Sequence, residues 1–413
     1  MKETRFKQTE IGLIPEDWEV TTLSKVCHIF GRIGFRGYTI ADIVTPNNGA
    51  ISISPTNIVN GKMDYSKCTY ISWYKYEESP EIKIYNGDIL IVKTGSTYGK
   101  SVLVKGLSQK ATINPQIVVL KNISTDNIFL SYICLTTLFL KQIDSVIVGG
   151  AIPTLSQHKL GQFLIPKLSI EEQKNIASAL TSIDNLLLSL DKLIEKKKLI
   201  KQGAMQELLT GKKRLPGFAG EWIEKRLGEI GEIIKESINP QLYRNQSFSE
   251  YSMPAYDLNK QPEIKYGEEM FSNRTKIDGT VLLYNKLNVR QRRIWYIENC
   301  KQNSICSMEF LPYKVYRDYL KFFYYKLSID SVVNFFVGIS KGTSNSQKRI
   351  SPNDFLDFKV KYPRELQEQK AIATVLSSID KEIESLEDKK AKYEQIKQGM
   401  MQQLLTGKIR LIS

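Results

Sequence analysis

The feature that most constrains this chain is a long segment that occurs twice. Residues 172–215 and 368–411 align without a gap, and roughly 25 of their 44 positions are identical. A repeat this strict indicates that two copies of one element do equivalent jobs in the same molecule.

Both copies have the apolar period of an amphipathic helix. Apolar residues recur at alternating steps of four and three, and Gly211 and Gly407 follow the last of them, where glycine commonly ends a helix. We therefore predict two helices of about 40 residues, each about 60 Å long, that pack together through one apolar seam. The seam residues are Ile176, Leu180, Ile183, Leu187 and Leu190 in the first copy and Ile372, Leu376, Ile379, Ile383 and Leu386 in the second.

Two details bear on that pairing. Lysines interrupt the seam in both copies, at Lys197, Lys201, Lys390 and Lys397. The alternative is that each helix packs only on its own domain. Identity at polar as well as apolar positions argues against this alternative, because packing alone would require only the apolar positions.

The regions before the two helices correspond more loosely. Trp18 and Trp222 are each followed five residues later by a leucine, and apolar strands are expected at 87–92 and 278–283. Aromatic, leucine-rich helices are expected at 128–143 and 316–327. The layout is thus domain, helix, domain, helix, with boundaries at 1–169, 170–211, 212–364 and 365–413. Identity persists in the helices and fades in the domains, as expected for a shared scaffold with two different surfaces.

Composition favours a polyanionic partner. The chain has 413 residues with a formal net charge of +14, and neutralising phosphates releases condensed counterions, so nucleic acid ranks ahead of an anionic membrane.

The start lacks the apolar core of a signal peptide, and the longest apolar run, 128–140, is too short to span a bilayer. The cysteines form no CxxC pair and only His28 and His158 are present. We expect no metal site, reduced thiols and a cytoplasmic location.

The helix pattern EQ…ID…KQG-x-MQ-x-LLTGK-x-RL, present twice, and the IP-x-x-W sequence ending at Trp18 resemble the specificity subunit of type I restriction-modification enzymes across essentially the whole chain. The second copy departs at 218–221, where Phe-Ala-Gly-Glu replaces Ile-Pro-Glu-Asp. The resemblance implies an α+β fold with an internal pseudo-twofold repeat. Two similar α/β target-recognition domains would be separated by two long antiparallel helices that form a coiled-coil spacer.

The resemblance also implies a function. Each domain would read one half of a split site in double-stranded DNA, and the helices would fix the gap. Partners would be two modification subunits, which carry S-adenosylmethionine and adenine-N6 methylation chemistry, and up to two restriction subunits that act as ATP- and Mg-dependent translocases and endonucleases. No cofactor is expected in this chain. A rigid spacer also suits half-sites about 34 to 36 Å apart, one turn of the DNA.

Two segments resemble catalytic motifs, but each lacks residues that its motif requires. The segment 95–101 resembles a phosphate-binding loop, but Thr94 stands where glycine is required, and the strand-like 102–104 follows where a helix should begin, which predicts a hairpin tip. The segment 114–117, Asn-Pro-Gln-Ile, lacks the second proline and the aromatic residue of an adenine methyltransferase motif. We therefore expect no catalytic residue. The alternative is a self-contained DNA-modifying enzyme with unrecognised catalytic residues, and a third possibility is a basic coiled-coil protein that organises other proteins.

Candidate DNA contacts are polar and basic residues grouped on diverged loops. The first domain offers Lys93, Ser96, Thr97, Tyr98 and Lys100, with Thr154, Ser156 and Gln157; the second offers Asn285, Lys286, Asn288, Arg290, Gln291, Arg292 and Arg293, with Thr343, Asn345, Gln347, Lys348 and Arg349. The bland alternative is that these are solvated turns. The arginines at 290–293 are favoured, because they stand beside Asn288 and Gln291 in the segment that aligns with the glycine loop of the first domain.

Further lysines lie near the middle of the long helices, at Lys196, Lys197, Lys198, Lys389, Lys390 and Lys392. We interpret them as a solvated gap, a register device or a partner-binding face rather than as DNA contacts.

Overall fold

The computed structural model describes residues 5–146, 155–344 and 346–411. The chain divides into two compact units. Unit 1 comprises Met1–Leu190 with Lys389–Ser413, and unit 2 comprises Asp191–Asp388. Two long helices, α5 (Ile170–Leu208) and α11 (Leu366–Leu404), each contribute one half to each unit.

Unit 1 is built on two sheets. The four-stranded antiparallel sheet has the order β12 (Ser101–Leu103), β11 (Ile89–Val92), β14 (Ile117–Lys121), β4 (His28–Gly31). The five-stranded sheet has the order β10 (Lys83–Ile84), β13 (Ala111–Ile113), β6 (Gly49–Ile53), β9 (Thr69–Ser72), β5 (Ile43–Val44), with β13 and β6 parallel. Smaller elements are β1 (Phe6–Thr9), β2 (Gly12–Pro15), β7 (Ile58–Val59), β8 (Lys62–Met63) and α1 (Trp73–Glu77).

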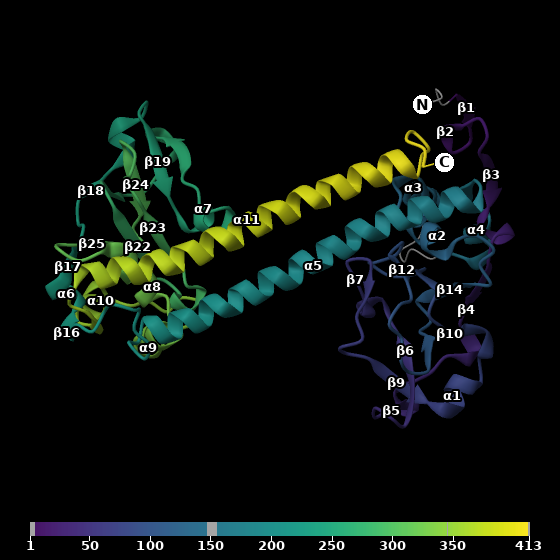
Figure 1. The fold of residues 1–413 in the computed structure, drawn as a ribbon, viewed down its shortest axis with the longest axis horizontal. Coiled ribbons are helices and arrows are strands. Elements are labelled where there is room, and N and C mark those ends of the chain that lie inside the picture. Colours follow the sequence, from purple (N-terminus) through teal and green to yellow (C-terminus); the bar gives the residue numbers. More distant parts are fainter. Residues whose placement is uncertain (1–4, 147–154, 345, 412–413) are drawn as a thin grey trace. The chain divides into compact units, whose positions relative to one another are not determined.

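The alternation of side chains along β11 explains why this strand is apolar throughout. Ile89 and Ile91 face a helix-covered cluster, whereas Leu90 and Val92 face the five-stranded sheet, so both faces are buried. The helices α2 (Asn127–Ile133), α3 (Thr137–Val146) and α4 (Gln157–Gly161) join the first cluster together with the start of α5 (Figure 1). A two-stranded sheet of β3 (Glu19–Thr22) and β15 (Leu164–Lys167) leads into α5.

Unit 2 repeats this arrangement. Its four-stranded sheet has the order β17 (Gly231–Ile233), β25 (Phe310–Val315), β22 (Val281–Asn285), β23 (Ile294–Ile297). Its five-stranded sheet has the order β18 (Ser237–Ile238), β21 (Arg274–Lys276), β24 (Ser304–Ser307), β19 (Ser247–Tyr251), β20 (Glu263–Tyr266), with β19 and β24 parallel. The other elements are β16 (Trp222–Arg226), paired with β26 (Lys359–Pro363), and helices α6 (Leu227–Ile230), α7 (Met253–Leu258), α8 (Leu320–Leu327), α9 (Asp330–Ile339) and α10 (Pro352–Leu356).

The apolar seam is buried as predicted. Eight of the ten seam residues are buried and two, Ile379 and Leu386, are half-buried. In unit 1, Ile176 and Leu180 share a cluster with Leu404 from the other helix. In unit 2, Ile372, Leu376 and Leu208 do the same. Each helix therefore packs both on its own domain and, antiparallel, on the other helix. The predicted fold class is confirmed.

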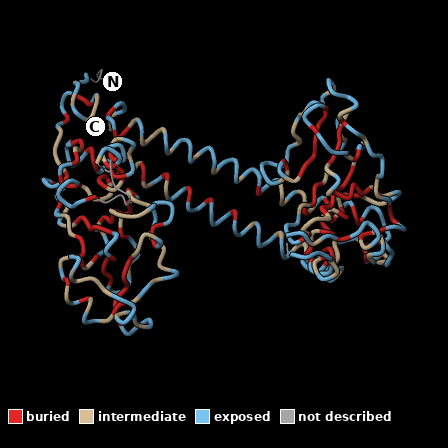
Figure 2. Tube along the Cα trace, turned by 180° about the vertical axis from the view of Figure 1, so that it is seen from behind, coloured by how far each residue is buried: buried red, intermediate tan, exposed pale blue. Residues whose placement is uncertain are grey.

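The outer faces of the two helices are largely exposed, and buried residues concentrate in the sheets and adjoining helices of each unit (Figure 2).

The two aromatic helices differ from the prediction. Instead of one helix over 128–143 there are two, α2 and α3, bent by 61°. Thr136 lies at the break, where its Oγ1 donates to Ile133 O (2.7 Å) and accepts from Phe139 N (3.3 Å). The helix expected from residue 316 begins at Leu320, because β25 runs to Val315. No single helix in the described ranges is long and apolar enough to cross a membrane, whereas the bent α2–α3 pair passes that test jointly by length and composition.

Candidate DNA interface and helix clamps

Two equivalent hairpin loops stand out. Hairpin loop 1 (residues 93–100) joins β11 to β12, and hairpin loop 2 (residues 286–293) joins β22 to β23, so each loop spans eight residues. In loop 1, Lys93 N donates to Gln116 O (2.8 Å), and Lys93 O accepts from Leu155 N (2.8 Å). In loop 2, Lys286 N donates to Glu309 O (2.9 Å), and Lys286 O accepts from Ile350 N (3.1 Å). The two loops therefore leave their strands in the same way.

The loops also share their backbone course. The third and seventh residues have positive φ in both: Gly95 (+100°) and Gly99 (+81°) in loop 1, and Asn288 (+51°) and Arg292 (+52°) in loop 2. Because β12 follows loop 1 where a nucleotide-binding loop would lead into a helix, the predicted hairpin tip is confirmed.

Loop 1 is sparsely paired. Ser96 and Lys100 are exposed and Thr97 is half-buried. Tyr98 Oη donates to Asp144 Oδ1 on α3 (3.2 Å), and this carboxylate raises the pKa of the Tyr98 phenol. Lys93 is half-buried, and burial lowers the pKa of its ammonium.

Two arginines of loop 2 form ion pairs with carboxylates outside the loop. Arg292 pairs with Asp330 (2.6 Å), and Arg293 makes a bidentate pair with Asp257 (2.8 and 2.7 Å), which raises the pKa of Arg293. Arg290 is exposed, and its guanidinium has no acceptor within the described part of the chain.

Two other candidate residues, one in loop 2 and one just before it, have different surroundings. Gln291 is exposed like Arg290. Asn285, at the end of β22, is only 2 % exposed, and its Oδ1 accepts from Leu287 N (2.8 Å), so this side chain shapes the start of the loop.

The second group of candidate residues in each domain, around Ser156 in unit 1 and around Lys348 in unit 2, lies next to the hairpin loop. In unit 2, Asn288 N donates to Lys348 O (2.8 Å), and Arg349 makes a bidentate pair with Glu309 (3.2 and 3.0 Å). Thr343 and Gln347 are exposed. In unit 1, Ser156 caps α4, and the Gln157 amide bonds to the backbone of β4 at Ile29 O (3.3 Å) and Gly31 N (3.0 Å). Thr154 and Asn345 lie outside the described residues.

Sequence reasoning missed the acidic partners Asp257, Glu309 and Asp330. They are separated from the arginines by 36 to 40 positions, and only the sheet pairing and the packing of α9 bring them together. No local sequence signal marks them.

The repeated polar residues of the long helices form matched clamps. In unit 1, Asp184 of α5 accepts from Tyr132 Oη of α2 (2.7 Å) and pairs with Lys397 of α11 (2.7 Å). In unit 2, Asp380 accepts from Tyr325 Oη (2.7 Å) and pairs with Lys201 (2.5 Å). Two of the lysines that interrupt the seam therefore each pair with the aspartate of the other copy of the motif.

A second clamp uses the glutamate and arginine of the motif. Arg410 donates to Glu172 (2.5 and 2.9 Å) and to Asp17 (2.8 and 2.7 Å), and Trp18 Nε1 also donates to Glu172 (3.1 Å). In unit 2, Arg214 donates to Glu368 (2.6 and 2.6 Å).

The departure of the second copy from the IP-x-x-W sequence is visible at Trp222. Its buried Nε1 lacks an acceptor among the described residues. The Arg214 and Lys326 cations lie 5.8 and 5.9 Å from the centroid of its ring.

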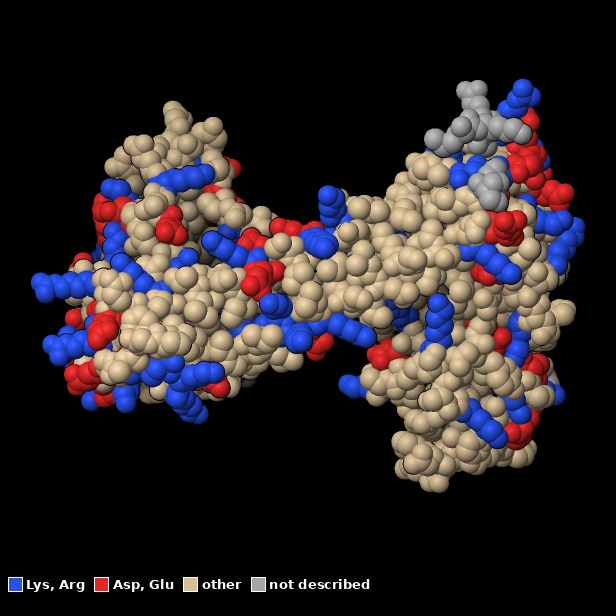
Figure 3. Space-filling model, in the orientation of Figure 1, with Lys and Arg blue, Asp and Glu red and all other residues tan. Residues whose placement is uncertain are grey.

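Lysines near the middle of the helices also pair across them. Lys197 contacts Glu382, and Lys198 pairs with Glu387 (2.6 Å), both within unit 2. These contacts support the interpretation of a register device. On the face seen in Figure 3, basic and acidic side chains are interspersed in both units.

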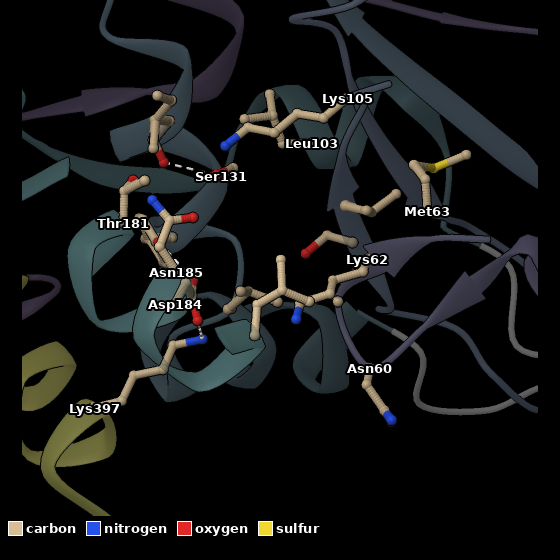
Figure 4. Close-up of a pocket in the computed structure, with 17 residues that line it drawn as sticks. Asn60, Lys62, Met63, Leu103, Lys105, Ser131, Thr181, Asp184, Asn185 and Lys397 are labelled. Carbon is tan, nitrogen blue, oxygen red and sulfur yellow. Dashed lines mark hydrogen bonds and ion pairs between the residues drawn. The ribbon is translucent and has the colours of Figure 1, made fainter. Parts of the chain in front are cut away.

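A pocket of about 330 Å³ lies in unit 1 between the β7–β8 hairpin, β12, α2 and α5 (Figure 4). The Asp184–Lys397 pair borders it. In unit 2 the positions that correspond to Leu103 and Ser131 carry Tyr296 and Tyr324, whose rings are 6.0 Å apart. Two aromatic rings thus stand in unit 2 at positions where the pocket of unit 1 is lined by the smaller side chains of Leu103 and Ser131. No group of His, Cys, Asp and Glu suited to a metal ion occurs in the ranges described.

The fold and these contacts define a class of protein: a scaffold with two copies of one recognition domain, each clamped to the same pair of helices. The chain belongs to the family whose model is described as the type I restriction modification DNA specificity domain, which matches residues 15–202 and 219–397. It is the specificity subunit of a type I restriction-modification system, with two recognition domains. The comparisons give no support to a self-contained enzyme.

Relatives agree with this assignment. The chain is 28% identical over 446 residues to the Methanocaldococcus jannaschii protein named "Putative type I restriction enzyme MjaX specificity subunit", covering 99% of this chain and 98% of that protein. It is 28% identical over 215 residues to the MjaVIII specificity subunit of the same organism, covering 51% of this chain and 49% of that protein.

Solved structures share the fold. The type I specificity subunit of M. genitalium matches with a TM-score of 0.58 at 15% identity, covering 94% of this chain and 96% of that one. A chain from a structural study of complex assembly and conformational transition in a type I system also matches with a TM-score of 0.58 at 15% identity, covering 96% and 99%.

Proposed function

We propose that each recognition domain reads one half of a bipartite DNA target, and that the long helices fix the gap between the half-sites and dock two modification subunits. The observation that carries this proposal is the shared frame of the two hairpin loops. Equal length, equal backbone anchors and equal positive-φ positions hold side chains of different chemistry, such as Thr97 and Arg290, at the same place. A common frame with different contact groups is what recognition of two different base sequences requires.

Arg290 is the best candidate for a base contact in loop 2, because its guanidinium is exposed and unpaired within the described chain. A bidentate arginine–guanine contact contributes about 1 to 3 kcal/mol of discrimination. We expect Arg290→Ala to relax the methylated motif at one base pair of one half-site. The measurement is sequencing of methylated adenines in DNA modified by the complete complex.

The control is Arg364→Ala, which removes an exposed arginine of unit 2 that pairs with Glu221. It should leave the motif unchanged. Loss of methylation at all sites alike in Arg290→Ala would mark a phosphate contact, and an unchanged motif would remove loop 2 from the reading surface.

The gap function rests on the two uninterrupted helices of 39 residues each. Seven residues inserted after Asp191 and seven after Asp388 keep the phase of the seam and lengthen each helix by about 10.5 Å. We expect the preferred gap to grow by about three base pairs at 3.4 Å per step, while the half-site sequences stay the same. Five-residue insertions turn the seam by about 140° and should abolish pairing. An unchanged gap in the seven-residue variant would remove the spacer role.

The partners follow from the family. We propose two modification subunits, which supply S-adenosylmethionine binding and adenine-N6 methylation, and up to two restriction subunits, which supply the ATP- and Mg-dependent activities, all in the cytoplasm. This chain contributes no catalytic group to that scheme. Native mass spectrometry of the reconstituted complex should give two modification subunits per chain. Methylation or cleavage of DNA by the purified chain alone would instead support a self-contained enzyme.

A further inference from the structure

The first residue of both hairpin loops is the same. Loop 1 reads Lys-Thr-Gly-Ser-Thr-Tyr-Gly-Lys and loop 2 reads Lys-Leu-Asn-Val-Arg-Gln-Arg-Arg, so only the first position, Lys93 or Lys286, is identical. The following side chains have diverged in size and in hydrogen-bonding capacity.

The backbone holds these two lysines in the same way. Each donates its N–H to the residue just before the strand that pairs with the first hairpin strand, β14 or β25. Each accepts at its carbonyl from the residue two positions before α4 or α10. These paired hydrogen bonds, at 2.8 to 3.1 Å, fix the position from which the side chain leaves the loop. The two ammonium groups therefore start from equivalent places in the two units.

Neither ammonium has an anionic partner in the part of the chain that the structure describes, although both side chains are half-buried. The neighbouring Arg292, Arg293 and Arg349 are each neutralised by a carboxylate. Gly31 lets the Lys93 ammonium lie close to β4, because a Cβ there would stand 3.5 Å from Lys93 Nζ and 2.6 Å from the Gln157 side-chain amide. Burial lowers the pKa of Lys93, so its ammonium is already partly stripped of water. A partly desolvated cation that has no anionic partner among the described residues is suited to an external anion.

We propose that Lys93 and Lys286 each bind a phosphate of the DNA backbone at the same place in the two half-sites, while the fifth and sixth loop positions face the bases. A residue shared by two readers of different sequences must contact something that both half-sites share, and the phosphate backbone is common to all DNA. The inference rests on the proposed function. In each loop the lysine would position the domain on the DNA backbone, and the later residues would contact the bases.

The test replaces each lysine by methionine, which keeps the apolar stem and removes the charge. The complex with modification subunits is titrated with its target DNA over a series of salt concentrations. Each phosphate contact contributes about 0.9 to the slope of log affinity against log salt. Lys93→Met and Lys286→Met should each lower that slope by about 0.9. The ratio of wild-type to variant affinity should therefore be about eightfold larger at 0.1 M salt than at 1 M salt. The double variant should lose about 60-fold, and the methylated motif should stay unchanged in all three.

Two controls accompany the series. Lys93→Arg and Lys286→Arg keep the charge and should retain the slope. Lys167→Met removes an exposed lysine that pairs with Glu19, and it should not change the slope. Thermal unfolding of each variant shows whether it is folded.

An unchanged slope in a folded lysine variant, or a change of recognised base in one half-site, overturns the phosphate assignment. If Arg290→Ala relaxes one base while the lysine variants keep the wild-type slope, base reading by loop 2 stands and only the phosphate role fails. If neither change has an effect, the reading role of the loops fails as well.

Discussion

Removing the Arg410 guanidinium tests the clamp that joins the end of the chain to the first domain. Arg410 makes four hydrogen bonds to Glu172 and Asp17, and its guanidinium carbon lies 5.5 Å from the centroid of the Trp18 ring. Glu172 is 2 % exposed, so in Arg410→Met its charge is left without a cationic partner and keeps only the Trp18 N–H.

The magnitude follows from burial. Breaking a buried pair by removing one partner costs about 3 to 5 kcal/mol, whereas an exposed pair contributes about 0 to 1 kcal/mol. The Asp17 side chain is 65 % exposed and so adds little. Because the Trp18 hydrogen bond survives, we expect about 3 kcal/mol, the lower end of the buried range.

Hydrogen exchange followed by mass spectrometry is the appropriate assay, because it reports the local opening of unit 1 by itself. Protection in the last turn of α11, around Leu404, should fall about 100-fold, since each factor of ten corresponds to about 1.4 kcal/mol. The matched control is Arg364→Met, whose pair with Glu221 is 71 % and 70 % exposed. It should change protection less than fivefold.

A double-mutant cycle separates pairing from packing. Adding Glu172→Gln to Arg410→Met removes the stranded charge, so the double variant should be less destabilised than the sum of the two single changes. If Arg410→Met behaves like the Arg364 control, or if the two effects simply add, the clamp does not stabilise unit 1.

Three further outcomes are expected. Burial lowers the pKa of Lys326 to about 8 from 10.5. Between these pH values the unfolded chain binds more protons than the folded chain, so the free energy of unfolding rises with pH. Chemical denaturation should show this free energy rising by roughly 3 kcal/mol more in the wild type than in Lys326→Met between pH 8 and pH 10.5. Gly231→Ala would place a Cβ 1.9 Å from Lys314 O, so we expect a loss of about 1 to 3 kcal/mol in thermal unfolding, whereas Gly228→Ala, with its nearest contact at 3.4 Å, should be tolerated. Tyr132→Phe removes a hydrogen bond to a carboxylate, and exchange protection of α2 should fall by an equivalent of about 1.5 to 3 kcal/mol, with Tyr325→Phe doing the same to α8.

The helices and strands were largely predictable because the same apolar pattern occurs in both halves of the sequence. A seam period that continues through two copies predicted helices of about 40 residues, and the structure has two of 39. The apolar strands after Gly87 and Gly279 were equally clear, because both of their faces are buried. The break at Thr136 was missed, because a continuous apolar run gives no sign of a capping hydroxyl.

The site was predictable only as a location. Basic and glycine-rich residues mark the hairpin loops, but the pairing of individual arginines depends on carboxylates that the sheets bring in from elsewhere. Likewise, the identity of Asp184 and Asp380 between copies signalled a shared role, while their partners Tyr132 and Tyr325 lie in domains that have otherwise diverged.

The discontinuity of unit 1 sets an order of events during synthesis. Unit 2 is one uninterrupted stretch, Asp191–Asp388, whereas unit 1 also needs Lys389–Ser413. The second recognition domain thus emerges from the ribosome with every residue of its unit before the first domain can receive Arg410. Nascent chains that stop before the last turn of α11 would contain all of unit 2, whereas unit 1 would still lack the contacts made by Arg410. This is the reverse of the usual order, in which the N-terminal domain is completed first.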